Sequence, residues 1–175
     1  MRKIKKLVAT LLAATMVMAM GVTAFAADSL ADGKYTAKQN LYKNSACTTT
    51  SMGDAALNDM RAEITIADDE ATLVVHTHEI TYLGLTGHLG KMVVNGKTVT
   101  PKQTTTNGVT DYYFTFTGLD ASTIYEGCVI TGKFTTYVGS MPMNATGYLK
   151  LTDITAKCKY VCKASCCTQK CSSLF

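Results

Sequence analysis

The stretch 70–80, EATLVVHTHEI, decides the fold class, because its side chains alternate between the two sides of an extended chain. The odd positions from Leu73 to Thr77 fall on one side, and the even positions from Val74 to His78 fall on the other. This period of two predicts a β-strand with one side turned towards a core.

Similar segments surround this stretch. The segment 61–67 is expected to pair with it across a turn at Asp68-Asp69, and Asn95-Gly96 predicts a hairpin within 91–100. A short helix beginning at Ser51 is expected over 51–57. The remaining predicted strands are 35–42, 109–117, 129–138 and 147–154, with a loop at 139–146 before the last one. Seven or eight short strands predict an all-β fold: a single antiparallel immunoglobulin-like β-sandwich with one short helix.

Residues 1–26 have the three parts of a secretory signal peptide. Four basic residues precede an apolar run at 7–22, and the small residues Ala24 and Ala26 follow it. An uncleaved membrane anchor is the alternative, because the apolar run approaches the roughly 20 residues of a spanning helix. We therefore expect a secreted or cell-surface protein with a sandwich domain at 27–155 and a separate tail at 156–175.

The charge distribution argues against nucleic-acid binding. The whole chain has 17 basic and 13 acidic residues, but four of the basic residues belong to the signal peptide. Four lysines lie in the tail without any acid, so the remaining body is mildly acidic. The net charge of +4 therefore arises from the two ends of the chain, and we expect no nucleic-acid partner.

Several segments together resemble the NEAT (near-iron-transporter) domains of Gram-positive bacteria, especially the divergent clostridial type. They are the opening stretch 32–36 (DGKYT), Ser51-Met52 at the start of the short helix, 82–87 (YLGLTG), and Ile124-Tyr125 before the long penultimate strand. The resemblance covers roughly residues 30–154. It implies an eight-stranded sandwich that binds haem between the short helix and the last hairpin, in a protein of iron acquisition.

The resemblance also implies which residues would hold the haem. Family members present a Tyr-x-x-x-Tyr motif on the last hairpin, and its first Tyr ligates the iron. When Tyr148 is matched to the second Tyr, Asn144 takes the ligand position. A thioether is also an accepted haem ligand, so methionines on the two sides of the pocket are alternative ligands; ordinary packing of these methionines is the competing interpretation. Tyr137 would stack on the porphyrin or close the edge of the sandwich. The expected haem-binding residues are Ser51, Met52, Tyr137, Met141, Met143 and Tyr148.

His76 and His78 are a second candidate site. Two residues apart on a strand, their imidazoles project from one face and could share a metal with a third ligand. A solvated strand face is the alternative. The sequence contains no nucleophile elbow, metalloprotease helix or evident Cys-His pair, so we expect no enzymatic activity.

The tail concentrates five of the seven cysteines within its last eighteen residues: Cys158, Cys162, Cys166, Cys167 and Cys171. Outside the cell the default state of cysteines is the disulfide, and an odd total leaves at least one thiol for another partner. Three interpretations are open: a tail pinned by disulfides, a cross-link to another surface molecule or a second copy, and a soft-metal site for Cu(I) or zinc.

Three functions follow from these features. The first is an exported binding module that captures haem or a related porphyrin. The second is a structural or adhesive surface sandwich without haem, tethered to surface proteins or the cell wall by its tail. The third is extracellular binding of a soft metal by the tail, with or without His76 and His78.

Overall fold

Ten antiparallel strands form one continuous sheet in the computed structural model of this protein, which describes residues 29–82 and 84–157. Hydrogen bonding runs in the order β4-β5-β9-β10-β1-β2-β3-β8-β7, and β6 pairs with β5. The strands are β1 (Gly33–Tyr42), β2 (Arg61–Ala67), β3 (Glu70–His78), β4 (Ile80–Tyr82), β5 (Leu85–Val94), β6 (Lys97–Val99), β7 (Lys102–Thr106), β8 (Val109–Asp120), β9 (Val129–Val138) and β10 (Met141–Ala156). The described residues also form two 3-10 helices, η1 (Met52–Ala56) and η2 (Ala121–Thr123).

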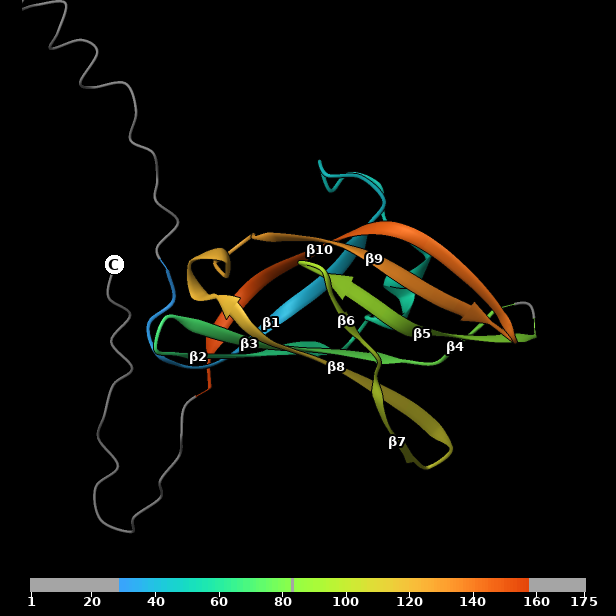
Figure 1. Cartoon of the computed structure of the whole chain (residues 1–175). Coiled ribbons are helices and arrows are strands. Elements are labelled where there is room, and N and C mark those ends of the chain that lie inside the picture. Colours follow the sequence, from blue (N-terminus) through green and yellow to red (C-terminus); the bar gives the residue numbers. More distant parts are fainter. Residues whose placement is uncertain (1–28, 83, 158–175) are drawn as a thin grey trace, which may run out of the picture.

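The sheet folds over on itself, so that its two halves face each other as the layers of a sandwich (Figure 1). The layer with β5, β9 and the first part of β10 covers the layer with β2, β3 and β8, and β3 contacts β5 while β6 contacts β8 across the interior. The predicted all-β sandwich is confirmed, with ten strands in place of the seven or eight expected.

The side chains between the two layers form one apolar core. The largest fully buried ones include Phe114 and Phe116 on β8, Leu73 on β3, and Leu149 on β10. The burial of β3 alternates residue by residue, as the sequence predicted, and the odd positions are the buried ones. Burial of these apolar surfaces at roughly 25 cal/mol per Å² is the main force that holds the layers together.

Two predicted hairpins are present with the expected turn residues. Asp68 and Asp69 both have positive φ angles, 52° and 62°, and Ala67 pairs with Glu70 across them. Asn95 and Gly96 also have positive φ angles, and they form the turn between β5 and β6. Positive φ at both central residues is the requirement of the turn that matches the twist of a hairpin.

One prediction about the strands was wrong, and two strands were not predicted. The segment 139–146 is not a loop, because β10 already begins at Met141 and pairs with β9 from there to Lys150, leaving Gly139-Ser140 as the turn. The polar strand β7 and the short strand β4 were not predicted, since neither has an alternating apolar pattern.

The short helix lies where the sequence placed it. The Ser51 side chain accepts a hydrogen bond from the Gly53 backbone N–H and so caps η1. Asp54 anchors the helix to β1, because its buried carboxylate accepts the Leu41 backbone N–H at 2.5 Å. The Ser51 bond therefore closes the start of η1, and the Asp54 bond fixes η1 against the sandwich.

Candidate functional site

The hairpin of β9 and β10 has two chemically different faces. The register between the strands is continuous from Met141 to Lys150, so successive β10 side chains point to opposite sides. The side that carries the buried Gly147, Leu149 and Leu151 is here called the inner face, and the side with Tyr148 and Lys150 the outer face. By this alternation Met141 and Met143 belong to the inner face, and Asn144 belongs to the outer face.

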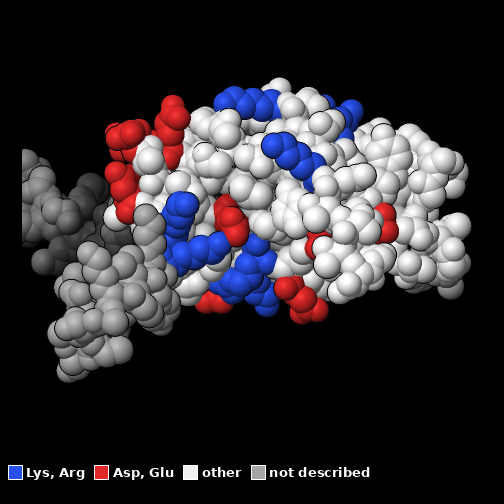
Figure 2. Space-filling model, turned by 90° about the horizontal axis from the view of Figure 1, so that it is seen from below, with Lys and Arg blue, Asp and Glu red and all other residues white. Residues whose placement is uncertain are grey.

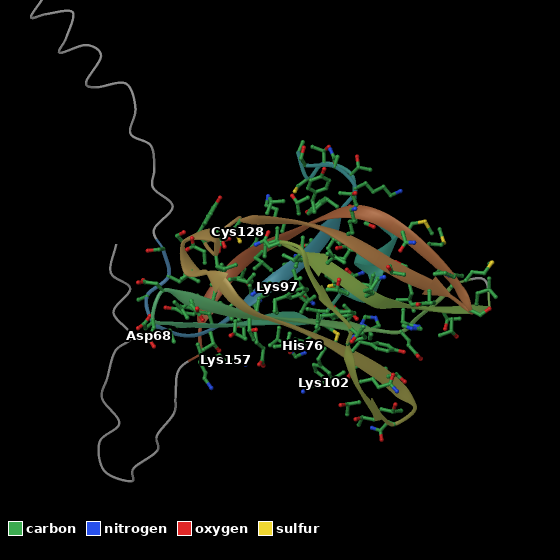
Figure 3. All side chains as sticks on the ribbon, in the orientation of Figure 1. Asp68, His76, Lys97, Lys102, Cys128 and Lys157 are labelled. Atoms are coloured by element: carbon green, nitrogen blue, oxygen red, sulfur yellow. The ribbon has the colours of Figure 1, made fainter. Side chains whose placement is uncertain are left out.

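The inner face continues beyond the core at the tip of the hairpin. Although they share a face with buried residues, Met141 and Met143 are 64% and 56% exposed. The tip of the β4–β5 hairpin is beside them, since the Gly139 N–H donates to the Thr86 carbonyl at 2.8 Å, and Leu85 there is also exposed. This end of the molecule, on the right in Figures 1 and 2, has almost no charged side chains, whereas acidic side chains gather at the opposite end, which carries Asp68 (Figures 2 and 3).

The helix η1 lies against residues of the same interior. A side chain added at Gly53 would contact Leu41 and Leu89, both fully buried core residues. The neighbouring Met52 turns to solvent and is 70% exposed. Three methionines are thus exposed, Met52 on η1 and Met141 and Met143 on the inner face of the hairpin tip. They are here called the exposed methionines.

The other predicted haem residues lie elsewhere on the hairpin. Tyr148 and Asn144 occupy the outer face, opposite to Met141 and Met143. Tyr137 pairs with Pro142, which is six residues from Tyr148 and therefore about 20 Å away along the strand. The six residues expected to form one haem pocket are accordingly divided between two faces, and those on η1 or on the inner face are Ser51 and the three methionines.

Tyr137 takes part in a stack of three rings that the sequence did not reveal. The His88 ring is stacked between Tyr112, at a centroid distance of 4.8 Å, and Tyr137, at 5.4 Å. Tyr137 also lies over Gly90, where a Cβ would come within 2.2 Å of its ring. The Tyr112 hydroxyl donates to Glu79 at 2.8 Å, and burial together with this bond raises the pKa of Tyr112 to about 12. The stack joins β5, β8 and β9 at the uncharged end.

His76 and His78 share one face of β3, as predicted. The His76 ring meets Tyr113 edge-on at 4.8 Å, and burial lowers its pKa despite the opposing influence of Glu63 (Figure 3). Among residues 29–82 and 84–157, no group of three or more metal-binding side chains surrounds either histidine. Within the described residues, the metal prediction therefore rests on these two histidines.

The body cysteines are not bonded to each other. Cys128 is 2% exposed, and burial raises the pKa of its thiol, so it is a poor nucleophile (Figure 3). Cys47 is partly exposed on the loop after β1. The predicted metal ligands or disulfide partners in the tail lie outside the described residues: Cys158, Cys162, Cys166, Cys167 and Cys171. The predicted signal peptide at 1–26 lies outside them as well.

None of the exposed methionines lines either of two hollows on the surface of the described part of the chain. A hollow of about 350 Å³ lies on the outer face of β5, β9 and β10, and one of about 300 Å³ lies near the start of β1. The larger hollow is lined in part by Asn144, the residue that takes the iron-ligand position of the NEAT motif. Within the described part of the chain, no helix is long and apolar enough to span a membrane.

Comparison of the chain with known families and with curated proteins found no matching family model and no matching protein. The resemblance to NEAT domains therefore remains a prediction from the sequence motifs.

Proposed function

We propose that this protein is a non-catalytic binding module outside the cytoplasm, which captures haem or a related porphyrin against the inner face of the β9–β10 hairpin. The observation that carries the proposal is the exposure of Met141 and Met143 on the face of β10 that carries the core residues Leu149 and Leu151 further along the strand. Exposed apolar side chains gathered at one uncharged end of a fold commonly mark a binding surface.

The chemistry of this surface suits a flat apolar ring. Thioethers are soft, polarisable groups that pack on aromatic surfaces and also bind haem iron. The tip supplies Met141, Met143 and the neighbouring Leu85, and η1 supplies Met52. The NEAT resemblance favours the same region, between the short helix and the last hairpin. In this proposal the ligand contacts Met141 and Met143, because the alternation of β10 puts them on the opposite face from Asn144 and Tyr148.

The signal-peptide pattern at 1–26 supports the extracellular location in this proposal. A haem-capturing module at the cell surface would serve iron acquisition. In that setting the Cys-rich tail at 156–175 would tether the module to the cell surface or to a second copy.

The test is an absorbance titration of the purified protein with hemin. We expect a saturable shift of the Soret band, and at least tenfold weaker binding in the double variant Met141→Gln, Met143→Gln. The matched control is Val109→Gln, because Val109 is equally apolar and exposed but lies at the β7–β8 turn. Absence of any Soret shift, or equal weakening in the control, would refute the proposal.

The second candidate is an adhesive module that uses the same apolar tip to contact a surface protein. The hydrogen bond that engages the Asn144 side chain favours it, because a carboxamide held by Thr135 is not available as an iron ligand. In this case hemin leaves the spectrum unchanged, while the same methionine variant abolishes attachment of the protein to intact cells.

A further inference from the structure

The hollow on the outer face is built from two rows of side chains on three neighbouring strands. Lys91, Thr135 and Asn144 are consecutive partners across β5, β9 and β10. Val93, Lys133 and Thr146 form the next row by the same pairings. These six residues, with Ala145, line the hollow of about 350 Å³ and are here called the outer groove.

The floor of the outer groove is ordered by a partly buried hydrogen bond. Thr135 is only 5% exposed, although it lies on the outer face. Its hydroxyl donates to Asn144 Oδ1 at 2.7 Å. This bond fixes the carboxamide and leaves the two Nδ2 hydrogens of Asn144 available as donors to a ligand.

The charge of the outer groove is positive. Lys91 and Lys133 are both exposed in it, and neither forms an ion pair within the described part of the chain. The strands β5 and β9 contain no acidic residue, and β10 contains none before Asp153. Two ammonium groups without a carboxylate nearby attract an anion, in a protein whose body is otherwise acidic.

Aromatic and basic side chains extend the same face. Tyr148 follows Thr146 on the outer side of β10, directly opposite Tyr42 on β1, and Lys150 follows it. Neither tyrosine is fully buried. The face therefore continues beyond the hollow as a strip with ring surfaces, hydroxyl groups and a third lysine.

We propose that the outer groove binds an acidic carbohydrate, a sugar polymer that carries carboxylate or phosphate groups. The lysines would pair with the acid groups, while Asn144 Nδ2 and the Thr146 hydroxyl would bind sugar hydroxyls. The tyrosines would stack on sugar rings further along the chain. The open shape of the groove fits an extended polymer, which needs no enclosed cavity, and the site is independent of the haem surface on the inner face.

The test measures binding of three oligosaccharides to the full chain by isothermal titration calorimetry: an oligoglucuronate, its carboxyl-reduced neutral counterpart, and an oligomer of glycerol phosphate. We expect at least one acidic probe to bind, with affinity that falls as salt is added, and the neutral one not to bind. Preference between the two acidic probes identifies the source of the negative charge.

Two variants localise the binding. Lys91→Gln with Lys133→Gln should weaken binding at least tenfold, whereas the control Lys34→Gln with Lys102→Gln removes the same charge at the start of β1 and on β7 and should change it less than twofold. Asn144→Asp keeps the acceptor for Thr135 but places a carboxylate in the groove, so binding should be lost while the hemin titration is unchanged. The proposal is overturned if neither acidic probe binds, if the neutral probe binds equally well, or if the control weakens binding as much as the groove variant does.

Discussion

The two faces of the β9–β10 hairpin differ in what their exposed side chains can bind. Beyond the core, the inner face has the apolar Met141 and Met143, and the outer face has the lysines and amide of the outer groove. Both faces come from the same strands, since alternation sends neighbouring residues to opposite sides. A hairpin that extends past its sandwich can therefore carry two unrelated surfaces without sharing a side chain.

The substitution with the largest expected effect, Phe134→Ala, should weaken binding at both faces of the hairpin. Phe134 is 3% exposed and lies over Gly147 on the neighbouring strand, where an added Cβ would come within 2.7 Å of its ring. This contact supports the hairpin near the point where it leaves the core. We expect Phe134→Ala to lower the free energy of unfolding by about 3–5 kcal/mol and to weaken both hemin and carbohydrate binding.

Urea denaturation followed by circular dichroism measures this loss. Thr131→Ala is the matched control, because Thr131 is an exposed residue of the same strand, and we expect a change within about 0.5 kcal/mol. A loss below about 1 kcal/mol for Phe134→Ala would mean that the hairpin is supported elsewhere.

The parts of the fold with strong local sequence patterns were predicted correctly. The alternation at 70–80, the turns at Asp68-Asp69 and Asn95-Gly96, and the cap at Ser51 all appear in the structure. The start of β10 was missed because Met-Pro-Met-Asn at 141–144 has few strand-forming residues, and its conformation depends on pairing with β9. Tertiary pairing outweighed local preference there.

The candidate sites were harder to predict for a related reason. The methionines were identified, but their face depends on which side of β10 is buried, and a one-residue shift reverses it. The row of Lys91, Thr135 and Asn144 joins strands far apart in the sequence, and only the register brings them together. His88 likewise meets Tyr112 through folding of the sheet, without any local signal.

Acidification should lower the stability of the protein by an intermediate amount and leave the two hairpin faces unchanged. The group expected to titrate is His76, which lies on β3. The pKa of His76 is lowered mainly by burial; Glu63 and Asp111 oppose this, and Lys157 adds to it. The folded protein therefore binds fewer protons than the unfolded chain below the ordinary value of 6.5. Stability should fall as the pH drops from about 7 to 5, by at most about 1.4 kcal/mol per pH unit for one group.

Urea midpoints measured across this pH range test the assignment. His76→Phe keeps an aromatic ring beside Tyr113 and should flatten the slope, whereas His78→Gln should leave it in place. An unchanged slope in His76→Phe would assign the pH dependence to another group. At each pH the relative affinities of the two hairpin faces should be unaffected by His76→Phe.

The smallest effect separates the two faces most cleanly. Thr135→Val keeps the shape of the side chain but removes the donor to Asn144 Oδ1, at a cost of about 1 kcal/mol in stability. Because the Asn144 carboxamide is then no longer oriented, acidic-sugar binding should weaken several-fold, while hemin binding at the inner face stays the same. Parallel calorimetry and Soret titrations measure both. Equal losses on the two sides would show that the faces are coupled through the hairpin backbone, and that alternation alone does not make them independent.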